Sequence, residues 1–141
     1  FKAFLSEGDE VVCLEPYFPF YGAQARLCGG VPVCFGLDAP EGETADWKFD
    51  IEKLEACITP KTKFFVFNNP LNPLGKLWKR SELEQIAALV KRHPQLYIIA
   101  DEVYEHTEFG DLEFIRFATI EGMWERTLSV KTFIFFIFNY F

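Results

Sequence analysis

Short apolar runs recur along the chain and alternate with segments of mixed polarity. Four of these runs contain almost no periodic polar residue, which is typical of strands buried on both faces. They lie at 10–14, 31–35, 63–67 and 96–100. Helices with one apolar face are predicted between them, at 21–27, 51–57 and 82–92. This alternation is typical of βαβ units, so we expect an α/β fold with three α/β/α layers and a mostly parallel sheet.

The ends of the predicted helices carry residues that suit helix termini. Asp50 is a good N-cap for the helix at 51–57. Ser81 and Glu84 have the spacing of a capping box, which predicts that the third helix begins directly after Ser81. Pro94 cannot continue a helix and predicts its end.

The composition is that of a globular chain of one domain. Half of its 141 residues are hydrophobic and 25% are charged, so it can bury a substantial core. The 21 acidic residues outnumber the 14 basic ones, and a net charge of −7 argues against a nucleic-acid partner. The four cysteines form no C-x-x-C pair, so we expect reduced structural thiols, no metal site, and an intracellular protein. Its location is expected to be cytoplasmic, or mitochondrial for a full-length form.

The two ends of the chain differ from the rest. Phe1 is not an initiating Met, and residues 1–5 are predicted to be the last turn of a helix, so we expect a fragment of a longer protein. Residues 134–141 form an uncharged, phenylalanine-rich tail. The tail is too short to span a membrane as a helix, and we expect no membrane partner.

Polar residues follow two of the predicted strands directly. The strand at 63–67 runs into an Asn-rich loop that contains Asn72, and the strand at 96–100 runs into Asp101. Because the helix between them acts as a crossover, the two strands should be parallel and their loops should open on one edge of the sheet. We therefore expect Asn72, Asp101 and Tyr104 to face one crevice.

An apolar strand followed by Asp-Glu also resembles the Mg²⁺-holding strand of P-loop nucleotidases. That fold needs the motif G-x-x-x-x-G-K-[ST] before the strand. Here Gly75-Lys76 is followed by Leu77, and Pro70 occupies the position of the first glycine. The phosphate cradle and the Mg²⁺ hydroxyl are both missing, which argues against a nucleotidase.

Three short motifs occur in a fixed order along the chain. They are Asn-Pro-Leu-Gly-Lys at 72–76, Ala-Asp-Glu-Val-Tyr at 100–104 and Lys-Thr-Phe at 131–133. Together they resemble the fold-type-I pyridoxal-phosphate enzymes of the class I/II aminotransferase family. Four further segments look most like its kynurenine aminotransferase branch, also known as glutamine transaminase K or cysteine-S-conjugate β-lyase. These segments are Asp-Glu-Val-Val at 9–12, Glu-Pro-Tyr-Phe at 15–18, Gly-Gly-Val-Pro at 29–32 and Met-Trp-Glu-Arg-Thr-Leu at 123–128.

The resemblance implies transfer of an amino group from an amino acid, such as kynurenine or glutamine, to a 2-oxo acid. Pyridoxal 5'-phosphate would be the cofactor, and the full-length family is expected to form homodimers. A side activity of β-elimination on cysteine conjugates would use the same chemistry. Residues 1–133 would be part of the large, cofactor-binding domain, with 134–141 as a tail outside the family pattern.

The same resemblance implies roles for five residues. Asp101 would pair with the pyridinium nitrogen, so that the ring can accept electrons. Asn72 and Tyr104 would donate hydrogen bonds to the 3' oxygen of the ring, and Phe18 would stack on the ring face. Lys131 would bind the cofactor covalently and then act as the acid and base that moves the substrate proton.

The chain departs from the family pattern just before Lys131. In the family, a short Gly/Ser-rich stretch separates a strand like 127–130 from the Lys-Thr-Phe motif, whereas here Val130 is bonded directly to Lys131. A misplacement of a catalytic group by a few ångströms can abolish chemistry. We therefore expect this chain to be poorly active on its own.

Two alternatives remain open from the sequence. The chain could be a non-catalytic product, either a truncated isoform that pairs with a full-length subunit or a fragment produced by gene prediction. The second alternative is a different pyridoxal-phosphate chemistry on the same fold, such as decarboxylation or synthase activity.

Overall fold

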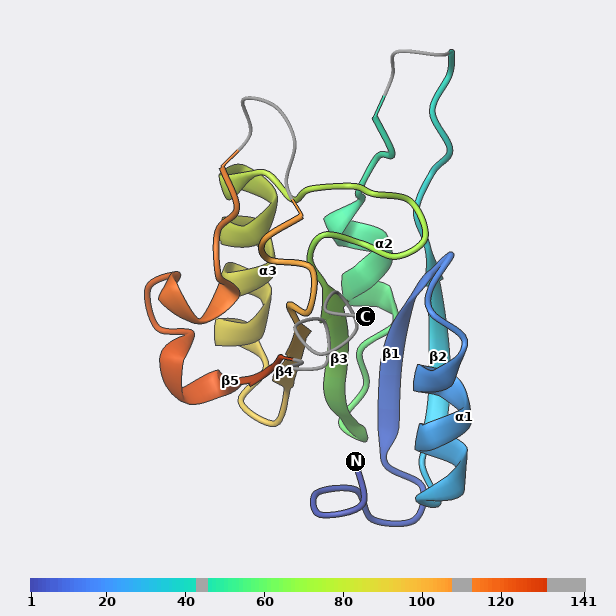
Figure 1. The fold of residues 1–141 in the computed structure, drawn as a ribbon. Helices are drawn as coiled ribbons and strands as arrows, with labels where there is room; N and C mark the ends of the chain where they lie inside the picture. The colour runs from blue at the N-terminus through green and yellow to red at the C-terminus, as the bar shows by residue number, and fades with distance from the viewer. Residues whose placement is uncertain (43–45, 108–112, 132–141) are drawn as a thin grey trace, which may run out of the picture.

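A five-stranded, fully parallel sheet forms the centre of the structure (Figure 1). The structure is a computed structural model and describes residues 1–42, 46–107 and 113–131. Neighbouring strands follow the order β2-β1-β3-β4-β5, and each pair is parallel. The strands are β1 (Glu10–Glu15), β2 (Val31–Gly36), β3 (Thr62–Asn68), β4 (Tyr97–Asp101) and β5 (Thr127–Val130). The predicted α/β fold with a parallel sheet is confirmed.

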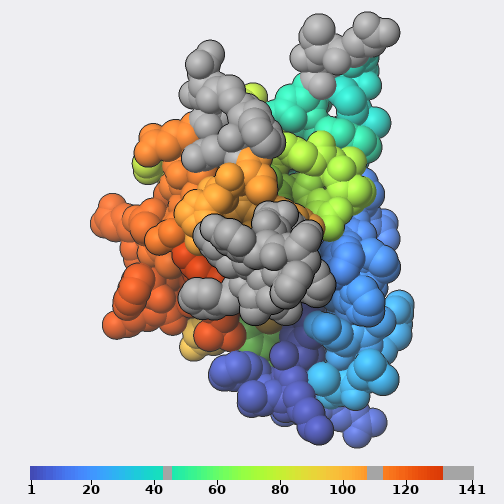
Figure 2. Space-filling view, viewed as in Figure 1, coloured from blue at the N-terminus to red at the C-terminus, as the bar shows by residue number. Residues whose placement is uncertain are grey.

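Helices cover both faces of this sheet and complete three layers (Figure 1). The helices are α1 (Phe20–Leu27), α2 (Ile51–Ala56) and α3 (Arg80–Arg92), with 3-10 turns η1 (Phe117–Thr119) and η2 (Trp124–Arg126). In the space-filling view, the N-terminal segment (blue) forms one flank and the segment around η1 and η2 (orange) forms the opposite flank (Figure 2). None of the helices among the described residues is long and apolar enough to cross a bilayer.

The helix termini confirm one capping prediction and correct another. The Asp50 carboxylate accepts hydrogen bonds from the backbone N–H groups of Glu52 and Lys53, at 2.9 and 3.2 Å, so it caps α2 as predicted. The capping box predicted at Ser81 and Glu84 is wrong, because α3 already begins at Arg80 and both residues lie inside it. The Glu82 carboxylate instead accepts the backbone N–H of Lys79, at 2.9 Å.

Alternate residues along each strand divide the core into two parts. Val12 and Leu14 join a large cluster that packs under α2 and α3 and contains the buried Phe67 and Trp78. The intervening residues of β1 and β3 form a smaller cluster under α1. We call the two sides of the sheet the α2/α3 face and the α1 face. The period of two places successive residues on opposite faces.

Three strand ends lie level at one edge of the sheet. In the register, Asn68 of β3 is the partner of Asp101 of β4, and Asp101 is the partner of Val130 of β5. The prediction that the loops after β3 and β4 open on the same edge is confirmed. Lys131 therefore follows immediately on the strand end that is level with Asp101. The predicted tail at 134–141 lies outside the described residues.

Candidate functional site

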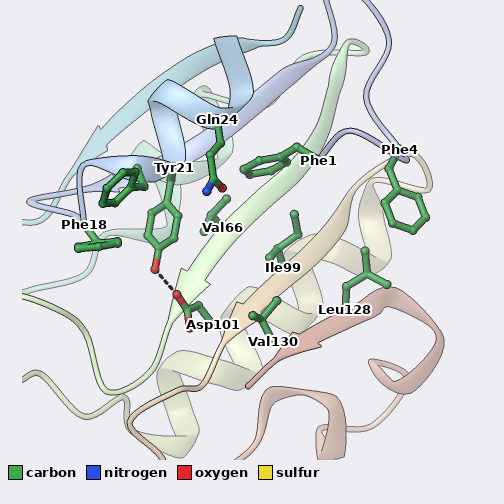
Figure 3. A pocket seen from close by; sticks show the side chains of 11 residues that line it. Phe1, Phe4, Phe18, Tyr21, Gln24, Val66, Ile99, Asp101, Leu128 and Val130 are labelled. Carbon is green, nitrogen blue, oxygen red and sulfur yellow. Dashed lines mark hydrogen bonds between the residues drawn. The ribbon is translucent and has the colours of Figure 1, made fainter. Parts of the chain in front are cut away.

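A cavity of about 610 Å³ lies on the α1 face, between α1 and the ends of β3, β4 and β5 (Figure 3). Its wall is largely apolar and contains four phenylalanines, Phe1, Phe4, Phe18 and Phe20. Asp101 is the one acidic or basic side chain among the described residues of the wall. Such a combination, an apolar cleft with one charged anchor and few other polar groups, is typical of sites for small ligands and cofactors.

The Asp101 carboxylate has two oxygens with different surroundings. Oδ2 accepts a hydrogen bond of 2.5 Å from the hydroxyl of Tyr21, which reaches across from α1 (Figure 3). Oδ1 is buried and has no hydrogen-bond partner among the described residues. A buried carboxylate oxygen that lacks a donor carries a desolvation cost of about 1–3 kcal/mol or more, which a bound donor would remove. The protonated ring nitrogen of pyridoxal phosphate is such a donor, so Asp101 fits the predicted cofactor.

Tyr21 is kept in its neutral, donating form by its surroundings. Burial, and after it the hydrogen bond to Asp101 and the negative charge of that carboxylate, raise the pKa of Tyr21 far above its ordinary value. The phenol therefore stays protonated at neutral pH. Its ring stacks with Tyr17 at 6.1 Å between centroids and contacts Phe18 edge-on at 6.1 Å.

Asn72 and Tyr104 meet at the edge where β3 and β4 end. The Asn72 side-chain amide donates to the Tyr104 hydroxyl at 3.2 Å. Asn68 connects this pair to Asp101, because its side-chain oxygen accepts the Asn72 backbone N–H at 2.6 Å and its amide donates to the Asp101 carbonyl at 2.8 Å. The structure thus brings Asn72, Tyr104 and Asp101 into one hydrogen-bonded edge.

The loop that carries Asn72 is held in place by a buried lysine. Lys76 is 4% exposed and forms ion pairs with Asp46 at 3.2 Å and with Glu82 of α3 at 3.0 Å. Its ammonium group also lies 5.2 Å from the centre of the Trp78 ring. The ion pair with Glu82 fixes the loop relative to α3, and so fixes the position of Asn72.

Phe18 lies on the cavity wall, as expected of a ring that would stack on a cofactor. It is 38% exposed and contacts the ring of Phe20 at 4.9 Å and that of Tyr21 at 6.1 Å. An aromatic ring that remains this exposed has a free surface available for a planar ligand.

The ammonium group of Lys131 forms an ion pair with Glu105. It lies 2.8 and 2.9 Å from the two carboxylate oxygens of Glu105, which also binds Arg116 at 2.5 Å. Burial acts to raise the pKa of Glu105, but the hydrogen bonds from Lys131 and Arg116 outweigh it and lower that pKa. Val130 lines the cavity, whereas the amino group of Lys131 is directed to Glu105.

Glu102, the neighbour of Asp101, belongs to the opposite face. It is fully buried, and its Oε1 accepts the backbone N–H of Phe117 at 2.9 Å. Burial raises the pKa of the Glu102 carboxyl, although the hydrogen bond from Phe117 partly offsets this effect. The Asp-Glu pair therefore contains one acid on the α1 face and one inside the core.

Comparison with known proteins identifies the family. A sequence model of the family described as aminotransferase class I and II matches residues 1–133. The chain belongs to the class I and II aminotransferases. This family is generally dependent on pyridoxal phosphate, and the resemblance found in the sequence is confirmed.

The curated relatives support the same assignment. The kynurenine–oxoglutarate transaminase of Dictyostelium discoideum is 40% identical over 140 residues, which cover 92% of this chain and 32% of the relative. The aspartate/prephenate aminotransferase of Cereibacter sphaeroides is 42% identical over 128 residues, covering 90% of this chain and 31% of the relative. The chain therefore spans about a third of the length of the curated relatives it matches.

Solved structures share the fold. The N-succinyldiaminopimelate aminotransferase of Mycobacterium tuberculosis matches with a TM-score of 0.86 and 30% identity, over 93% of this chain and 33% of that one. The aromatic aminotransferase of Pyrococcus horikoshii matches with a TM-score of 0.84 and 36% identity, over 94% of this chain and 34% of that one. Relatives of similar identity thus carry names that refer to different amino acids.

Sequence reasoning missed three residues that build the site. Tyr21 follows Phe18 by three residues, a spacing that places both on one side of a helix start and could have drawn attention to it. Asn68 falls in the predicted Asn-rich loop after the strand at 63–67, although an Asn at a strand end is a natural hydrogen-bond bridge. No signal in the sequence pointed to the pairing of Glu105 with Lys131.

Proposed function

We propose that this chain is part of the large, cofactor-binding domain of a pyridoxal-phosphate-dependent aminotransferase. The reaction would transfer an amino group from an amino acid such as kynurenine or glutamine to a 2-oxo acid. The observation that carries the proposal is the side chain of Asp101, a residue that lines an apolar cavity and whose buried Oδ1 has no donor within the described part of the chain. The homodimer and the cytoplasmic or mitochondrial location expected for the full-length protein belong to the same proposal.

Asp101 would hold the cofactor through Oδ1. Bound pyridoxal phosphate supplies an electron sink that accepts the electrons left when a substrate loses its Cα proton. An ionised carboxylate beside the ring nitrogen favours the protonated ring, because the charge-assisted hydrogen bond stabilises the pyridinium form. The apolar wall strengthens this interaction by excluding water.

The remaining site residues would orient the ring. Asn72 and Tyr104 would donate to its 3' oxygen from the edge at which they already contact each other. Phe18 would lie against the ring face with its exposed surface. These contacts would restrict the ring to one orientation, which is the main contribution that a protein makes to cofactor chemistry.

Lys131 would carry the acid–base step. Its amine would take the proton from the substrate Cα and return it to the cofactor carbon. To do so, Lys131 has to leave its ion pair with Glu105. The same proton removal would serve β-elimination from cysteine conjugates. The ion pair is consistent with the poor activity expected from the missing spacer before Lys131.

The proposal is tested with the purified chain and pyridoxal phosphate. Binding is followed by cofactor absorbance, the complex is reduced with borohydride, and the labelled lysine is identified by mass spectrometry of peptides. We expect saturable binding that the Asp101→Asn variant weakens, with Lys131 as the main labelled lysine. Labelling spread over exposed lysines, with equal binding to Asp101→Asn, would contradict the proposal.

The same preparation distinguishes the non-catalytic alternative. Kynurenine and 2-oxoglutarate are added, and keto-acid formation is measured with the chain alone and with a full-length relative. Specific binding without turnover, together with co-elution with the full-length subunit in size-exclusion chromatography, would support the truncated-isoform reading. Turnover by the chain alone would support an active enzyme.

A further inference from the structure

The contact between Tyr21 and Asp101 joins two segments that are 80 residues apart in the chain. The family resemblance gives a role to Asp101 and none to Tyr21. Figure 3 shows the Tyr21 ring extending from α1 across the cavity wall to the end of β4, with its hydroxyl directed at the carboxylate. The position of Asp101 at the cavity thus depends on α1 as well as on its own strand.

A carboxylate on a strand end can rotate about its last side-chain bond and present either oxygen to a ligand. The hydroxyl of Tyr21 removes this freedom, because it donates to Oδ2 at 2.5 Å, whereas Oδ1 has no donor in residues 1–42, 46–107 and 113–131. The tyrosine ring is itself held between Tyr17 and Phe18. A donor fixed in this way restricts the rotation of the carboxylate.

We propose that Tyr21 is a positioning residue that fixes the Asp101 carboxylate so that Oδ1 is presented to the ring nitrogen of the cofactor. The inference rests on the proposed function, since it assumes that a pyridine ring occupies the cavity. It goes beyond that function because it assigns to α1 a part in setting the electronic state of the ring. Phe18 and Tyr21 would then act together. Phe18 would contact the ring face, and Tyr21 would position Asp101, which would bind the ring nitrogen.

A purely structural role for Tyr21 makes a different prediction. If the hydroxyl only satisfies a buried carboxylate, its removal lowers stability and weakens all ligands of the cavity alike. If it positions Oδ1, its removal weakens specifically those ligands that have a protonated ring nitrogen. The two roles are therefore separated by a ligand that differs in this one atom.

The experiment compares pyridoxal phosphate with its 1-deaza analogue, in which a C–H group replaces the ring nitrogen. Dissociation constants are measured for the full chain, for Tyr21→Phe and for the control Tyr17→Phe, which removes a hydroxyl from the neighbouring stacked ring. We expect Tyr21→Phe to weaken pyridoxal phosphate about tenfold, as expected for one hydrogen bond to a charged group. Binding of the deaza analogue should be almost unchanged, and Tyr17→Phe should change neither constant.

Three results would overturn the inference. Tyr21→Phe could bind pyridoxal phosphate as tightly as the parent chain, or it could lose affinity equally for both ligands. It could also still weaken pyridoxal phosphate selectively when Asp101 is already replaced by Asn, which would show that it does not act through Asp101. If the parent chain binds pyridoxal phosphate but Tyr21→Phe shows no selective loss, the proposed function stands and only the inference fails.

A second readout needs no cofactor. The chain is labelled with ¹³C at the tyrosine Cζ position, and the Tyr21 resonance is assigned with Tyr21→Phe. We expect this resonance to shift when Asp101 is replaced by Asn, because the phenol loses its charged acceptor. An unchanged resonance would show that the hydrogen bond is absent in solution and would overturn the inference, whether or not the chain binds pyridoxal phosphate.

Discussion

The two faces of the sheet use the same strands in different ways. On the α2/α3 face, the side chains of β3 and β4 are packed under two helices and joined by Trp78, which contacts Phe67 at 5.0 Å between ring centroids. On the α1 face a single short helix covers a smaller cluster and leaves a cavity of about 610 Å³. We therefore expect the α2/α3 face to supply most of the stability, while the α1 face retains the space that a ligand needs.

This division follows from the alternation of side chains along each strand. Ile98 and Ile99 point to opposite faces, as do Asp101 and Glu102. A strand buried on both faces has no polar residue that marks the functional side, so the division becomes visible only in three dimensions. Each adjacent pair provides matched substitutions, because its two residues are neighbours in the chain and differ in the face of the sheet on which their side chains lie.

The largest expected difference is between the two isoleucines of β4. Ile98 is fully buried on the α2/α3 face, so Ile98→Ala should lower the free energy of unfolding by about 3–5 kcal/mol. Ile99 is partly exposed at the cavity, and Ile99→Ala should cost about 1–2 kcal/mol. Urea unfolding followed by circular dichroism measures both.

If Ile98→Ala does not fold, the pair of Val substitutions at the same positions repeats the comparison. These remove one methylene each, and the expected cost at Ile98 is about 1 kcal/mol. Equal losses at the two positions would show that the α1 face is packed as tightly as the other, and the proposed asymmetry would be wrong.

The next difference concerns two neighbouring asparagines at the end of β3. Asn68 joins Asp101 to Asn72, whereas the Asn69 side chain binds the carbonyl of Ile115 at 3.2 Å. Asn68→Ala and Asn69→Ala should each lower the free energy of unfolding by about 2 kcal/mol, because each leaves buried polar groups without a partner. Only Asn68→Ala should also weaken pyridoxal phosphate. Calorimetric titration of both variants tests this, and parallel losses of affinity would remove the special role of Asn68.

The sequence was sufficient for most of the fold because its signals are local. Apolar runs predicted four of the five strands, β1 to β4, and the crossover argument placed the ends of β3 and β4 on one edge. The predicted start of α3 is two residues too late, because Ser81 and Glu84 satisfy the capping pattern although Lys79 and Glu82 form the contact.

The candidate site was less accessible to sequence reasoning because its contacts are distant along the chain. The hydrogen bond from Tyr21 to Asp101 depends on how α1 packs against the sheet, and no local pattern encodes that packing. The same holds for Glu105 and Lys131, which are 26 residues apart. The motif resemblance singled out Asp101 of the two adjacent acids, but it did not show which residues contact that carboxylate.

The two adjacent acids at the end of β4 should differ in their response to pH. Because burial raises the pKa of Glu102 in the folded chain, the folded state binds this proton more tightly than the unfolded state. The contribution to stability is therefore present below the ordinary pKa of 4.5 and is lost as the pH rises through the raised value. Glu102→Gln should remove this part of the pH dependence and leave the affinity for pyridoxal phosphate unchanged.

Urea unfolding at a series of pH values from 4 to 8 measures the effect, with Asp101→Asn as the partner variant. That variant should weaken the cofactor, in contrast to Glu102→Gln. A stability curve for Glu102→Gln that keeps the full pH dependence of the parent chain would show that another group causes it. A loss of cofactor affinity in Glu102→Gln would place Glu102, and not only Asp101, in the site.

The smallest effect on stability is expected for the ion pairs at Glu105. Lys131 and Arg116 are 38% and 48% exposed, so Glu105→Gln should lower the free energy of unfolding by less than about 1 kcal/mol, and less at high salt. Because the pKa of Glu105 is lowered, the contribution of its ion pairs to stability is present above the ordinary pKa of 4.5 and is lost as the pH falls through the lowered pKa.

The effect of Glu105→Gln on the candidate site should exceed its effect on stability. Without its partner, Lys131 is free to reach the cavity, so borohydride labelling at Lys131 should increase in Glu105→Gln and remain at the parent level in Glu113→Gln, an exposed control. Unchanged labelling in both variants would show that the short connection from Val130, and not the ion pair, keeps Lys131 from Asp101.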